Sequence, residues 1–363
     1  MPMKRKGLFV SALVLACVVS LTGCSTASNS GTATTAASSA AGGTAKYLAP
    51  KKDGPYKVAL ADSFTDNTWR TQVTQEFNYA CQNTYKDKVT CLPAADANHD
   101  TGTQISQISN FITQGVDILL VDANDGSALN QVIQQANAAG IQVVDFDNVT
   151  TSEYAIHVGE DQTQIGKLGG EWLASLLKSG DTVISLDGIS GNPTSDQRKA
   201  GADAALAAAG IKIVARADTN WDRATAQTAA ASLLAANPGI KAVYSQGGDS
   251  SLGAIAAMQQ LGMQVLPIPG EGSNGFLKAW QALSTSQPGF TSWAFASPPQ
   301  LVVNALDVAI KARQGTDPGQ TVNLDIPVIT QDTLAKNVKP NLNDNLWLPT
   351  QLPDDFLQAN YAN

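Results

Sequence analysis

Residues 57–70 read KVALADSFTDNTWR, and this stretch decides the fold class. The short apolar run from Lys57 to Ala61 predicts a buried strand. The polar residues after it lead into a stretch with helical periodicity, residues 67–84. A buried strand followed by an amphipathic helix is the repeating unit of parallel α/β sheets, so this unit predicts an α/β fold.

The same strand-helix unit repeats along the chain. After residues 57–61, the first set of strands is predicted at 88–92, 117–121 and 142–146, and a second set at 155–158, 182–186, 212–215, 242–245 and 265–268. Helices are predicted at 67–84, 103–114, 127–139, 162–178, 195–209, 222–236 and 250–261. Gly140, Gly210 and Gly262 each follow a helix and precede a strand, as left-handed C-caps do.

Two successive sets of units without a second linker predict two Rossmann-like lobes, each a doubly wound parallel sheet. A last strand-helix-strand passage, residues 290–329, is left over and returns the chain to the first lobe, which creates a multi-strand hinge. Residues 337–363 show little periodicity and are expected to form an irregular tail on the surface. The expected division is a signal peptide (1–23), an anchor cysteine with a flexible linker (24–54), an N-terminal lobe (55–158 plus 296–325) and a C-terminal lobe with the tail (159–295 plus 326–363).

The N-terminus has the pattern of an export signal. Positive residues at 4–6 precede an apolar run at 7–21, which is short for a membrane span. The motif Leu21-Thr22-Gly23-Cys24 resembles the bacterial lipobox, whose cysteine is acylated and becomes the mature N-terminus. An uncleaved anchor helix is the alternative, and either form puts the rest of the chain outside the cytoplasm, at the outer face of the cell membrane.

Composition restricts the partners of the exported chain. Residues 25–46 are almost wholly Ser, Thr, Ala, Gly and Asn, which is typical of a flexible tether. Loss of the three positive charges of the signal changes the net charge from −8 to −11, which argues against nucleic acid as a partner. Only 15% of the residues are charged, and such a polar, weakly charged composition suits hydrogen bonding to a neutral hydroxylated ligand.

Cysteine use agrees with export. Cys17 lies in the signal and Cys24 is the expected lipid site, so Cys81 and Cys91 are the thiols of the folded part. An oxidising exterior favours a disulfide between them, although two unlinked thiols remain the alternative. With His99 and His157 as the only histidines and no clustered thiols, the chain has little material for a zinc site.

Ligands of parallel sheets bind beyond the carboxyl ends of the strands, so polar and aromatic residues there are candidates. The first strand runs into Asp66-Asn67-Thr68-Trp69-Arg70 at the start of a helix. This stretch, together with the signal and the strand-helix order, resembles the sugar-binding periplasmic receptors of ABC importers, of the ribose and galactofuranose type. The resemblance implies a type I periplasmic-binding-protein fold whose lobes close over a sugar.

The resemblance and the chemistry of sugars together point to a set of ligand-binding residues. An aromatic ring covers the apolar face of a sugar while a guanidinium and carboxylates bond its hydroxyls, and Trp69 and Trp221 are expected to sandwich the ring. The alternative is that Trp69 caps a core and Arg70 is solvated. The candidates are Asn67, Trp69, Arg70, Asp147, Asn148, Asp196, Arg198, Trp221, Gln246, Asp249, Glu271 and Asn274. Asp161 is expected to be a hinge or helix-cap residue.

The chain also departs from the family pattern. Asn148 stands where the family usually has arginine, and Gly247-Gly248-Asp249 stands where many members have Asn-Asp-Glu. Residues 270–274 replace a common Gly-Phe-Asp, which makes Glu271 and Asn274 substitutes. These differences leave the identity of the ligand open.

Two other motifs resemble a dinucleotide-binding turn and a calcium-binding loop, but each lacks a residue that the function requires. Gly270, Gly272 and Gly275 form a G-x-G-x-x-G, but no acidic residue stands about twenty positions downstream to hold a nucleotide ribose. The stretch 96–100 begins like an EF-hand loop, but Thr101 replaces its essential glycine. We therefore expect neither a cofactor nor a metal.

The sequence as a whole predicts an extracytoplasmic lipoprotein that binds a monosaccharide or polyol and delivers it to an ABC importer permease. It is expected to be a monomer and not an enzyme. A chemotaxis or quorum-signal receptor of the same fold, or an extracellular hydrolase, are the alternatives. Trp69→Ala or Asp147→Ala is expected to abolish binding without unfolding the chain. A transcriptional regulator of related fold is disfavoured, because the lipobox replaces any DNA-binding helix pair.

Overall fold

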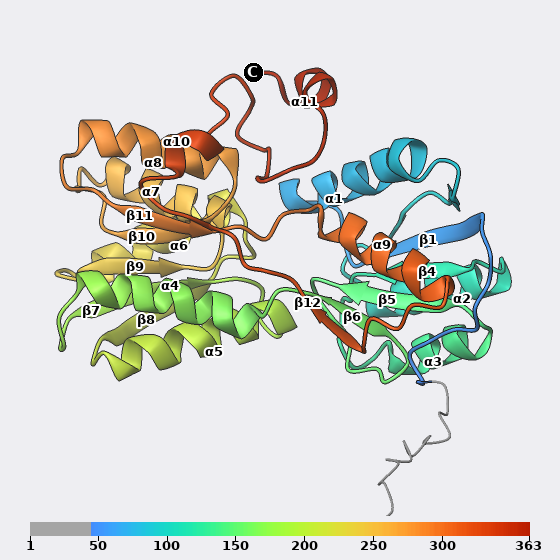
Figure 1. Ribbon diagram of the computed structural model, residues 1–363. Helices are drawn as coiled ribbons and strands as arrows, with labels where there is room; N and C mark the ends of the chain where they lie inside the picture. Colours follow the sequence, from blue (N-terminus) through green and yellow to red (C-terminus); the bar gives the residue numbers. More distant parts are fainter. Residues whose placement is uncertain (1–44) are drawn as a thin grey trace, which may run out of the picture. The chain divides into compact units, whose positions relative to one another are not determined.

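The computed structural model describes residues 45–363, which form two α/β lobes connected by several extended segments (Figure 1). The expected signal, lipobox and most of the linker lie outside the described residues. The two-lobed α/β fold with parallel sheets confirms the fold class predicted from the strand-helix repeat.

The first lobe is built on one parallel sheet in the order β12-β6-β5-β4-β1-β2, with β3 added beside β1. Its strands are β1 (Tyr56–Asp62), β2 (Val89–Cys91), β3 (Ala95–Asp96), β4 (Ile118–Val121), β5 (Gln142–Phe146), β6 (Ile156–Gly159) and β12 (Thr321–Asn323). Successive strand residues point to opposite faces, so the sheet buries apolar side chains on both.

Two pairs of helices cover these faces. The helices are α1 (Thr68–Tyr79), continued by the π-helix η1 (Ala80–Thr84), α2 (Thr101–Thr113), α3 (Asn130–Ala138) and α9 (Leu301–Arg313). Val58 and Leu60 of β1 pack in one core with α1 and α9, while Ala59 and Ala61 pack in another with α2 and α3. Helix α9 therefore returns to the first lobe, as expected from the sequence.

The second lobe holds two three-stranded sheets, in the orders β8-β7-β9 and β10-β11-β13. The strands are β7 (Thr182–Asp187), β8 (Lys212–Asp218), β9 (Ala242–Ser245), β10 (Ile268–Glu271), β11 (Ser292–Phe295) and β13 (Val328–Ile329), the last antiparallel to β11. The helices are α4 (Gln162–Leu176), α5 (Pro193–Ala208), α6 (Arg223–Ala236), α7 (Gly248–Gln260) and α8 (Asn274–Ser286). The sheets meet where the Val243 N–H donates to the Pro267 carbonyl at 3.0 Å.

Three sequence predictions need correction. The strand predicted at 155–158 pairs in parallel with β5, so it closes the first set of strands and does not open the second. The strand predicted at 265–268 begins at Ile268 and extends to Glu271, which is the range that pairs in parallel with β11. The expected irregular tail, which follows α10 (Leu334–Asn337), contains α11 (Asp354–Tyr361) and packs against elements of both lobes.

Local predictions at helix ends agree with the structure. Gly140, Gly210 and Gly262 have φ values of 80°, 72° and 68°, the left-handed conformation of C-cap glycines. Asp161 is the N-cap of α4, where its carboxylate accepts from the Gln164 N–H at 2.9 Å. Asp161 is therefore a cap, one of its two expected roles.

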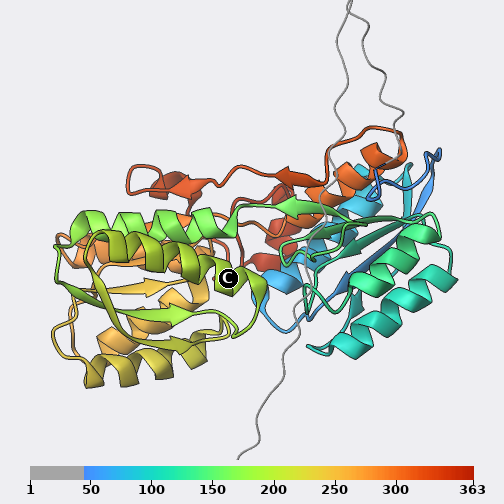
Figure 2. The same cartoon turned by 90° about the horizontal axis from the view of Figure 1, so that it is seen from below.

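The chain crosses between the lobes at three extended segments, and Figure 2 shows them side by side from below. The segments join β6 to α4, β11 to α9, and β12 to β13. Ser297 in the second crossing donates to Glu160 in the first at 3.2 Å. A multi-strand hinge of this kind fixes the lobes along one line while leaving the space beside it open for a pocket.

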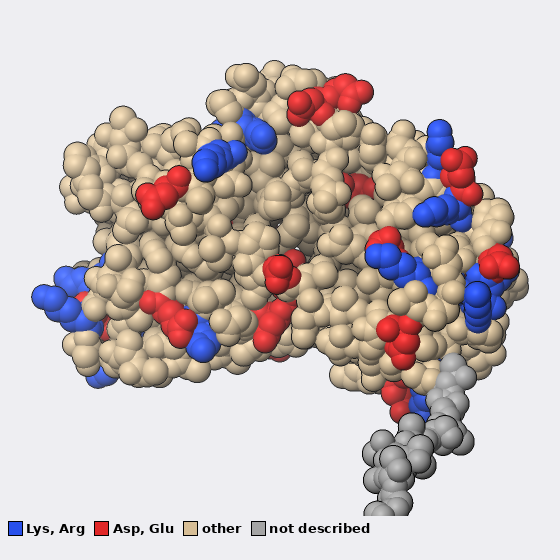
Figure 3. All heavy atoms as spheres, viewed as in Figure 1, with Lys and Arg blue, Asp and Glu red and all other residues tan. Residues whose placement is uncertain are grey.

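The disulfide and the surface charges match the expectations drawn from the cysteine use and the low content of charged residues. A disulfide joins Cys81 in the first part of η1 to Cys91 in β2, as predicted. On the face drawn in Figure 3, acidic and basic side chains of the described residues are scattered, and no broad basic patch is seen. Within residues 45–363, no helix has both the length and the apolar character of a membrane span.

Candidate functional site

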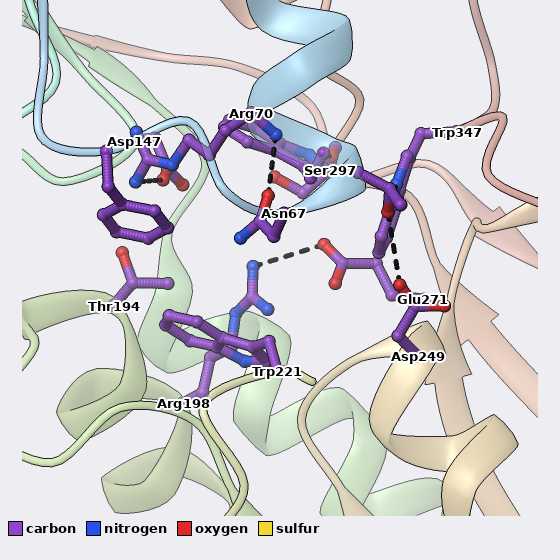
Figure 4. A pocket seen from close by; sticks show the side chains of 13 residues that line it. Asn67, Arg70, Asp147, Thr194, Arg198, Trp221, Asp249, Glu271, Ser297 and Trp347 are labelled. Atoms are coloured by element: carbon purple, nitrogen blue, oxygen red, sulfur yellow. Dashed lines mark hydrogen bonds and ion pairs between the residues drawn. The ribbon is translucent and has the colours of Figure 1, made fainter. Parts of the chain in front are cut away.

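A pocket with an open volume of about 50 Å³, partly exposed to solvent, lies between the lobes beside the hinge. The pocket is lined by Phe64, Asn67, Thr68, Trp69, Arg70, Asp147, Thr194, Arg198, Trp221, Asp249, Glu271, Ser297 and Trp347. Side chains from both lobes point into it (Figure 4), so a bound molecule would contact both lobes at once.

On the first-lobe side, Arg70 is held by three carboxylates. Its guanidinium lies 3.0 Å from Asp62, 3.3 Å from Asp147, and in direct contact with Asp122. Only 2% of Arg70 is exposed, and its charge stacks 4.6 Å from the centre of the Phe64 ring. Because the guanidinium is fixed on several sides, it presents a rigid donor edge to the pocket.

On the second-lobe side, Arg198 is fixed in a comparable way. Its Nε donates to Gln162 at 2.8 Å and one terminal nitrogen to the Gln246 carbonyl at 2.9 Å. The other terminal nitrogen lies 3.5 Å from Glu271 (Figure 4). The two buried arginines therefore face the pocket from opposite lobes, each with carboxylate acceptors beside it.

Burial changes the protonation of the carboxyls around this pocket. Desolvation raises the pKa of Glu271 to about 7, although the positive charge of Arg198 opposes the shift. Desolvation, with repulsion from Asp147, likewise raises the pKa of Glu160 to about 7. The pKa of Asp249 is raised by burial, against the effect of Arg223. The site can therefore offer both protonated and ionised carboxyls near neutral pH.

Trp221 forms one wall of the pocket in an unusual backbone conformation. Asn220 and Trp221 have φ values of 54° and 52°, which is rare for a bulky residue. A Cβ at Gly188 would lie 2.3 Å from the Trp221 ring and one at Gly247 2.8 Å from it, so both glycines make room for the indole. The Trp221 Nε1 is buried and has no hydrogen-bond partner among residues 45–363.

Trp69 and Trp347 form another part of the wall. The Trp69 indole N–H donates to the Ser297 carbonyl at 2.8 Å, and the Trp347 indole N–H donates to the Thr68 hydroxyl at 2.9 Å. Both tryptophans are less than a tenth exposed. Since their N–H groups are already bonded, they offer the pocket apolar ring surface.

Strand and helix ends place the polar residues of the pocket. Asn67 is the N-cap of α1 and accepts from the Arg70 N–H at 2.8 Å, so its amide nitrogen remains for a ligand. Asp147 follows β5 with φ 56°, a left-handed conformation that aspartate tolerates. Asp249 lies in the first turn of α7 and accepts from Thr68 of the first lobe at 3.2 Å.

Four of the predicted ligand residues do not line the pocket. Asp196 is exposed on α5. Asn148 is buried and links the lobes, because it donates to Asp122 at 3.1 Å and accepts from Thr194 at 2.8 Å. Gln246 has both amide atoms engaged, including acceptance from the Gly188 N–H at 3.1 Å.

Asn274 has a structural role in place of the expected contact with the ligand. Its side-chain amide donates to the carbonyls of Lys339, Leu342 and Asn343 at 2.8–3.0 Å. Its side-chain oxygen accepts from the Lys339 N–H at 2.9 Å. The residue is fully buried and therefore holds the C-terminal segment against α8.

The other predicted residues meet in one pocket, although their contact with a ligand stays a prediction. They are Asn67, Trp69, Arg70, Asp147, Arg198, Trp221, Asp249 and Glu271. Sequence reasoning missed Phe64, Thr68, Thr194, Ser297 and Trp347, which also line it. Phe64 and Thr68 stood within the deciding stretch, whereas Trp347 lies in the segment read as an irregular tail.

The motifs set aside in the sequence have structural explanations. Gly270, Gly272 and Gly275 lie at the β10–α8 turn, where a Cβ on Gly272 would come 2.3 Å from the Leu348 carbonyl. Gly272 and Gly275 therefore allow close packing of the C-terminal segment, whereas Gly270 makes room for the Phe276 ring. Among residues 45–363, no group of His, Cys, Asp and Glu side chains is arranged to hold a metal ion.

This structure has two α/β lobes built on parallel strands, a multi-strand hinge and a polar pocket between the lobes. These features define the class of cleft-type solute-binding proteins. Within this class, the chain belongs to the periplasmic binding protein domain family, whose model matches residues 58–317. The match confirms the family resemblance seen in the sequence, apart from its lipoprotein part. The family consists of binding proteins, which agrees with the expectation that the chain is not an enzyme.

The relatives include sugar-binding proteins. The chain is 28% identical over 180 residues to the ribose import binding protein of Escherichia coli K12, covering 49% of this chain and 61% of that protein. It is 35% identical over 170 residues to the D-ribose/D-allose-binding protein of Pseudomonas aeruginosa, covering 45% of this chain and 53% of that protein. The chain thus spans little more than half the length of these two relatives.

A solved structure has the same fold. An ABC transporter solute-binding protein from Mycobacterium smegmatis with bound glycerol superposes with a TM-score of 0.71 at 23% identity. The alignment covers 82% of this chain and 100% of that one.

Proposed function

We propose that the chain is an extracytoplasmic solute receptor that binds a monosaccharide or polyol in the interlobe pocket and passes it unchanged to an ABC importer. The observation that carries this proposal is the pair of fixed arginines, Arg70 and Arg198, that face one pocket from opposite lobes between tryptophan rings. Hydroxyl groups can accept from the guanidiniums and donate to the neighbouring carboxylates, while the rings cover the C–H faces of a sugar.

The names of the relatives support this ligand class. They bind ribose, ribose or allose, and glycerol, all of which are small neutral polyhydroxyl compounds. We further propose that the lobes have the boundaries expected from the sequence, 55–158 with 296–325 and 159–295 with 326–363, and that the protein acts as a monomer. The proposed ligand contacts are Asn67, Trp69, Arg70, Asp147, Arg198, Trp221, Asp249 and Glu271.

A thermal-shift screen tests the ligand class. Pentoses, hexoses, polyols and cyclitols are each added to the mature protein, and a ligand that binds only the folded state raises the Tm. At a concentration of about 100 times Kd, the gain is about 2.7 kcal/mol. Calorimetry then measures Kd, and mass spectrometry of the released compound checks that it is chemically unchanged. No Tm shift with any compound of the panel, or recovery of a hydrolysed product, would refute the proposal.

We also propose that Cys24 carries the lipid that holds the receptor at the outer face of the cell membrane. The lipobox-like motif and the linker composition support this anchor. Expression of wild type and Cys24→Ser in a bacterial host tests it by fractionation. We expect the wild-type protein in the membrane fraction. The Cys24→Ser variant cannot be processed as a lipoprotein, so we expect it to incorporate no fatty-acid analogue in a labelling experiment.

A further inference from the structure

Residues 339–361, here called the C-terminal strap, contact both lobes. The strap lies beyond residues 58–317, the part that matches the family model. In Figure 1 the last part of the chain runs over the top of the molecule between α8 and α1. Its apolar residues Leu346, Leu348 and Leu357 are each less than a twentieth exposed and belong to the second-lobe core. The strap is therefore an ordered part of the fold.

The attachment of the strap to the second lobe is extensive. The Asn274 side chain bonds three strap carbonyls, and the Asn274 N–H donates to the Leu346 carbonyl at 2.7 Å. The Leu348 N–H donates to the Gly272 carbonyl at 2.8 Å, and the Gly275 N–H to the Asp344 carbonyl at 3.1 Å. The strap thus pairs with the β10–α8 turn almost as an added strand would.

The attachment to the first lobe is made by one face of α1. The Gln72 side chain accepts from the Trp347 N–H at 2.8 Å and donates to the Trp347 carbonyl at 3.1 Å. Thr350 donates to Glu76 at 2.6 Å, and Tyr361 donates to Gln75. These α1 residues lie within about one helical turn of each other, so they form a single docking face.

Trp347 lies where the two attachments meet. Its backbone is held by Gln72 of the first lobe, while its neighbour Leu348 is held by Gly272 of the second. Its indole donates to Thr68, lines the pocket and is buried, with 6% of the residue exposed. Thr68 in turn donates to Asp249 across the cleft, so the Trp347 ring stands beside a hydrogen bond that joins the lobes.

We infer that Trp347 contacts the ligand. The C-terminal strap places its ring in the pocket, so this part of the pocket wall comes from neither lobe's sheet. This inference rests on the proposed function. The strap has more and deeper contacts with the second lobe than with α1, so it stays on the second lobe when the lobes separate. Opening then breaks the contacts of Trp347 with Gln72 and Thr68, and closure over a sugar restores them.

Binding by Trp347 variants tests the wall. The probe is whichever of D-ribose, D-allose and glycerol gives wild type the largest Tm shift, and calorimetry measures Kd. Trp347→Leu removes the ring face and is expected to weaken binding by about tenfold or more. Trp347→Phe keeps a ring but loses the bond to Thr68, so an intermediate loss is expected. Unchanged affinity in a folded Trp347→Leu protein overturns the inference.

Two further variants distinguish the effect of the Trp347 ring on binding from the effect of the other strap contacts. Tyr361→Phe removes a strap contact with α1 outside the pocket, so its Kd is expected to stay within about twofold of wild type. Gln72→Ala changes no side chain of the pocket but removes the two hydrogen bonds that hold the backbone of Trp347. We expect this variant to bind the sugar several-fold more weakly than wild type. Gln72→Ala also keeps the test valid if Trp347→Leu does not fold. Wild-type affinity in Gln72→Ala would then contradict the inference.

Hydrogen exchange tests the strap without any ligand. In Gln72→Ala, amides of residues 345–352 are expected to exchange faster than in wild type, while residues 339–344, held by Asn274, stay unchanged. Thr71→Ala, on an exposed side of α1 without a strap contact, is the matched control. If no sugar binds wild type, the proposed function fails, whereas equal exchange in Gln72→Ala and wild type refutes the strap itself.

Discussion

At the residue scale, the pocket combines fixed charges with a strained aromatic wall. Arg70 and Arg198 are buried and bonded on several sides, so little further ordering of these side chains is needed for binding. Trp221 keeps a left-handed backbone conformation and a buried indole N–H without a partner. Conformational strain and an unused buried donor at one residue are features of sites arranged for a ligand rather than for stability.

Trp221→Ala is therefore expected to weaken sugar binding by about tenfold or more with little loss of stability. The ring packs against Gly188 and Gly247 and belongs to none of the apolar core clusters of residues 45–363. Calorimetry and thermal unfolding measure the two effects separately. Trp221→Phe is the graded control, with an intermediate Kd, and wild-type affinity in the alanine variant would exclude Trp221 from the site.

Substitution of Trp69 is expected to affect folding as well as binding, so it tests the ligand site less selectively than substitution of Trp221. It is 9% exposed and packs in the first-lobe core with Val73 and Phe77 of α1. Its replacement by alanine removes core packing as well as a pocket wall, which typically costs several kcal/mol. We therefore expect Trp69→Ala to lower the Tm, contrary to the prediction that it would leave folding unaffected.

At the element scale, close packing of α4 and α5 positions Arg198. A Cβ on Gly166 would lie 1.9 Å from the Arg198 carbonyl, and one on Gly201 would lie 2.0 Å from the Thr163 carbonyl. The two helices can approach this closely because glycines stand at both points of contact. Their separation therefore sets the position of Arg198 relative to the pocket.

Gly166→Ala is expected to destabilise the protein by roughly 1–3 kcal/mol, because the clash is with backbone that cannot move alone. The displaced α5 is also expected to weaken sugar binding. Gly102→Ala in α2 is the matched control, since its nearest neighbour would be Asp100 at 3.4 Å and alanine favours a helix. Chemical denaturation compares the two, and equal stability would contradict the packing argument.

The disulfide belongs to the same scale. It closes a loop across a sequence separation of 10 residues between η1 and β2. Loss of this cross-link in a Cys81→Ala/Cys91→Ala variant is expected to lower stability by roughly 2–3 kcal/mol through the unfolded state. Denaturation of the variant beside oxidised and reduced wild type measures it. A variant as stable as oxidised wild type would show that the bridge contributes nothing.

Local sequence patterns predicted the elements well where the signal was local. Strand runs, glycine C-caps and the polar ends of strands located residues such as Arg70 and Trp221 without a structure. The patterns failed where a partner is remote in sequence. Asn274 contacts residues about 65 positions later, and the bounds of β10 follow its pairing with β11. Trp347 sits in a non-periodic segment whose packing no local pattern encodes.

At the scale of the whole molecule, buried carboxyls lie where the lobes meet. Glu160 is in the first crossing segment and Glu271 faces Arg198 in the pocket. Burial raises the pKa of each to about 7. The folded protein therefore binds more protons than the unfolded chain between about pH 4.5 and pH 7, and the contribution of these groups to the free energy of unfolding falls as pH rises through this window.

Glu160→Gln removes this pH dependence for one group. The variant is expected to match wild type near pH 4.5 and to be more stable above pH 7, by at most about 3 kcal/mol. Glu160 does not line the pocket, so binding is a secondary readout. Thermal unfolding of both proteins from pH 4.5 to 8 gives the difference. A constant difference across this range would show that folding does not change the pKa of Glu160.

The glycines behind Trp221 have a consequence for redesign. A methyl group at Gly188 would push the indole forward and narrow the space for a guest molecule, whereas a smaller ring at 221 would widen it. Selectivity between pentoses and hexoses can thus be altered from behind the wall, with the arginine and carboxylate side chains left as they are. Libraries confined to positions 188, 221 and 247 would show whether a receptor of this kind can be retuned into a biosensor for a chosen sugar.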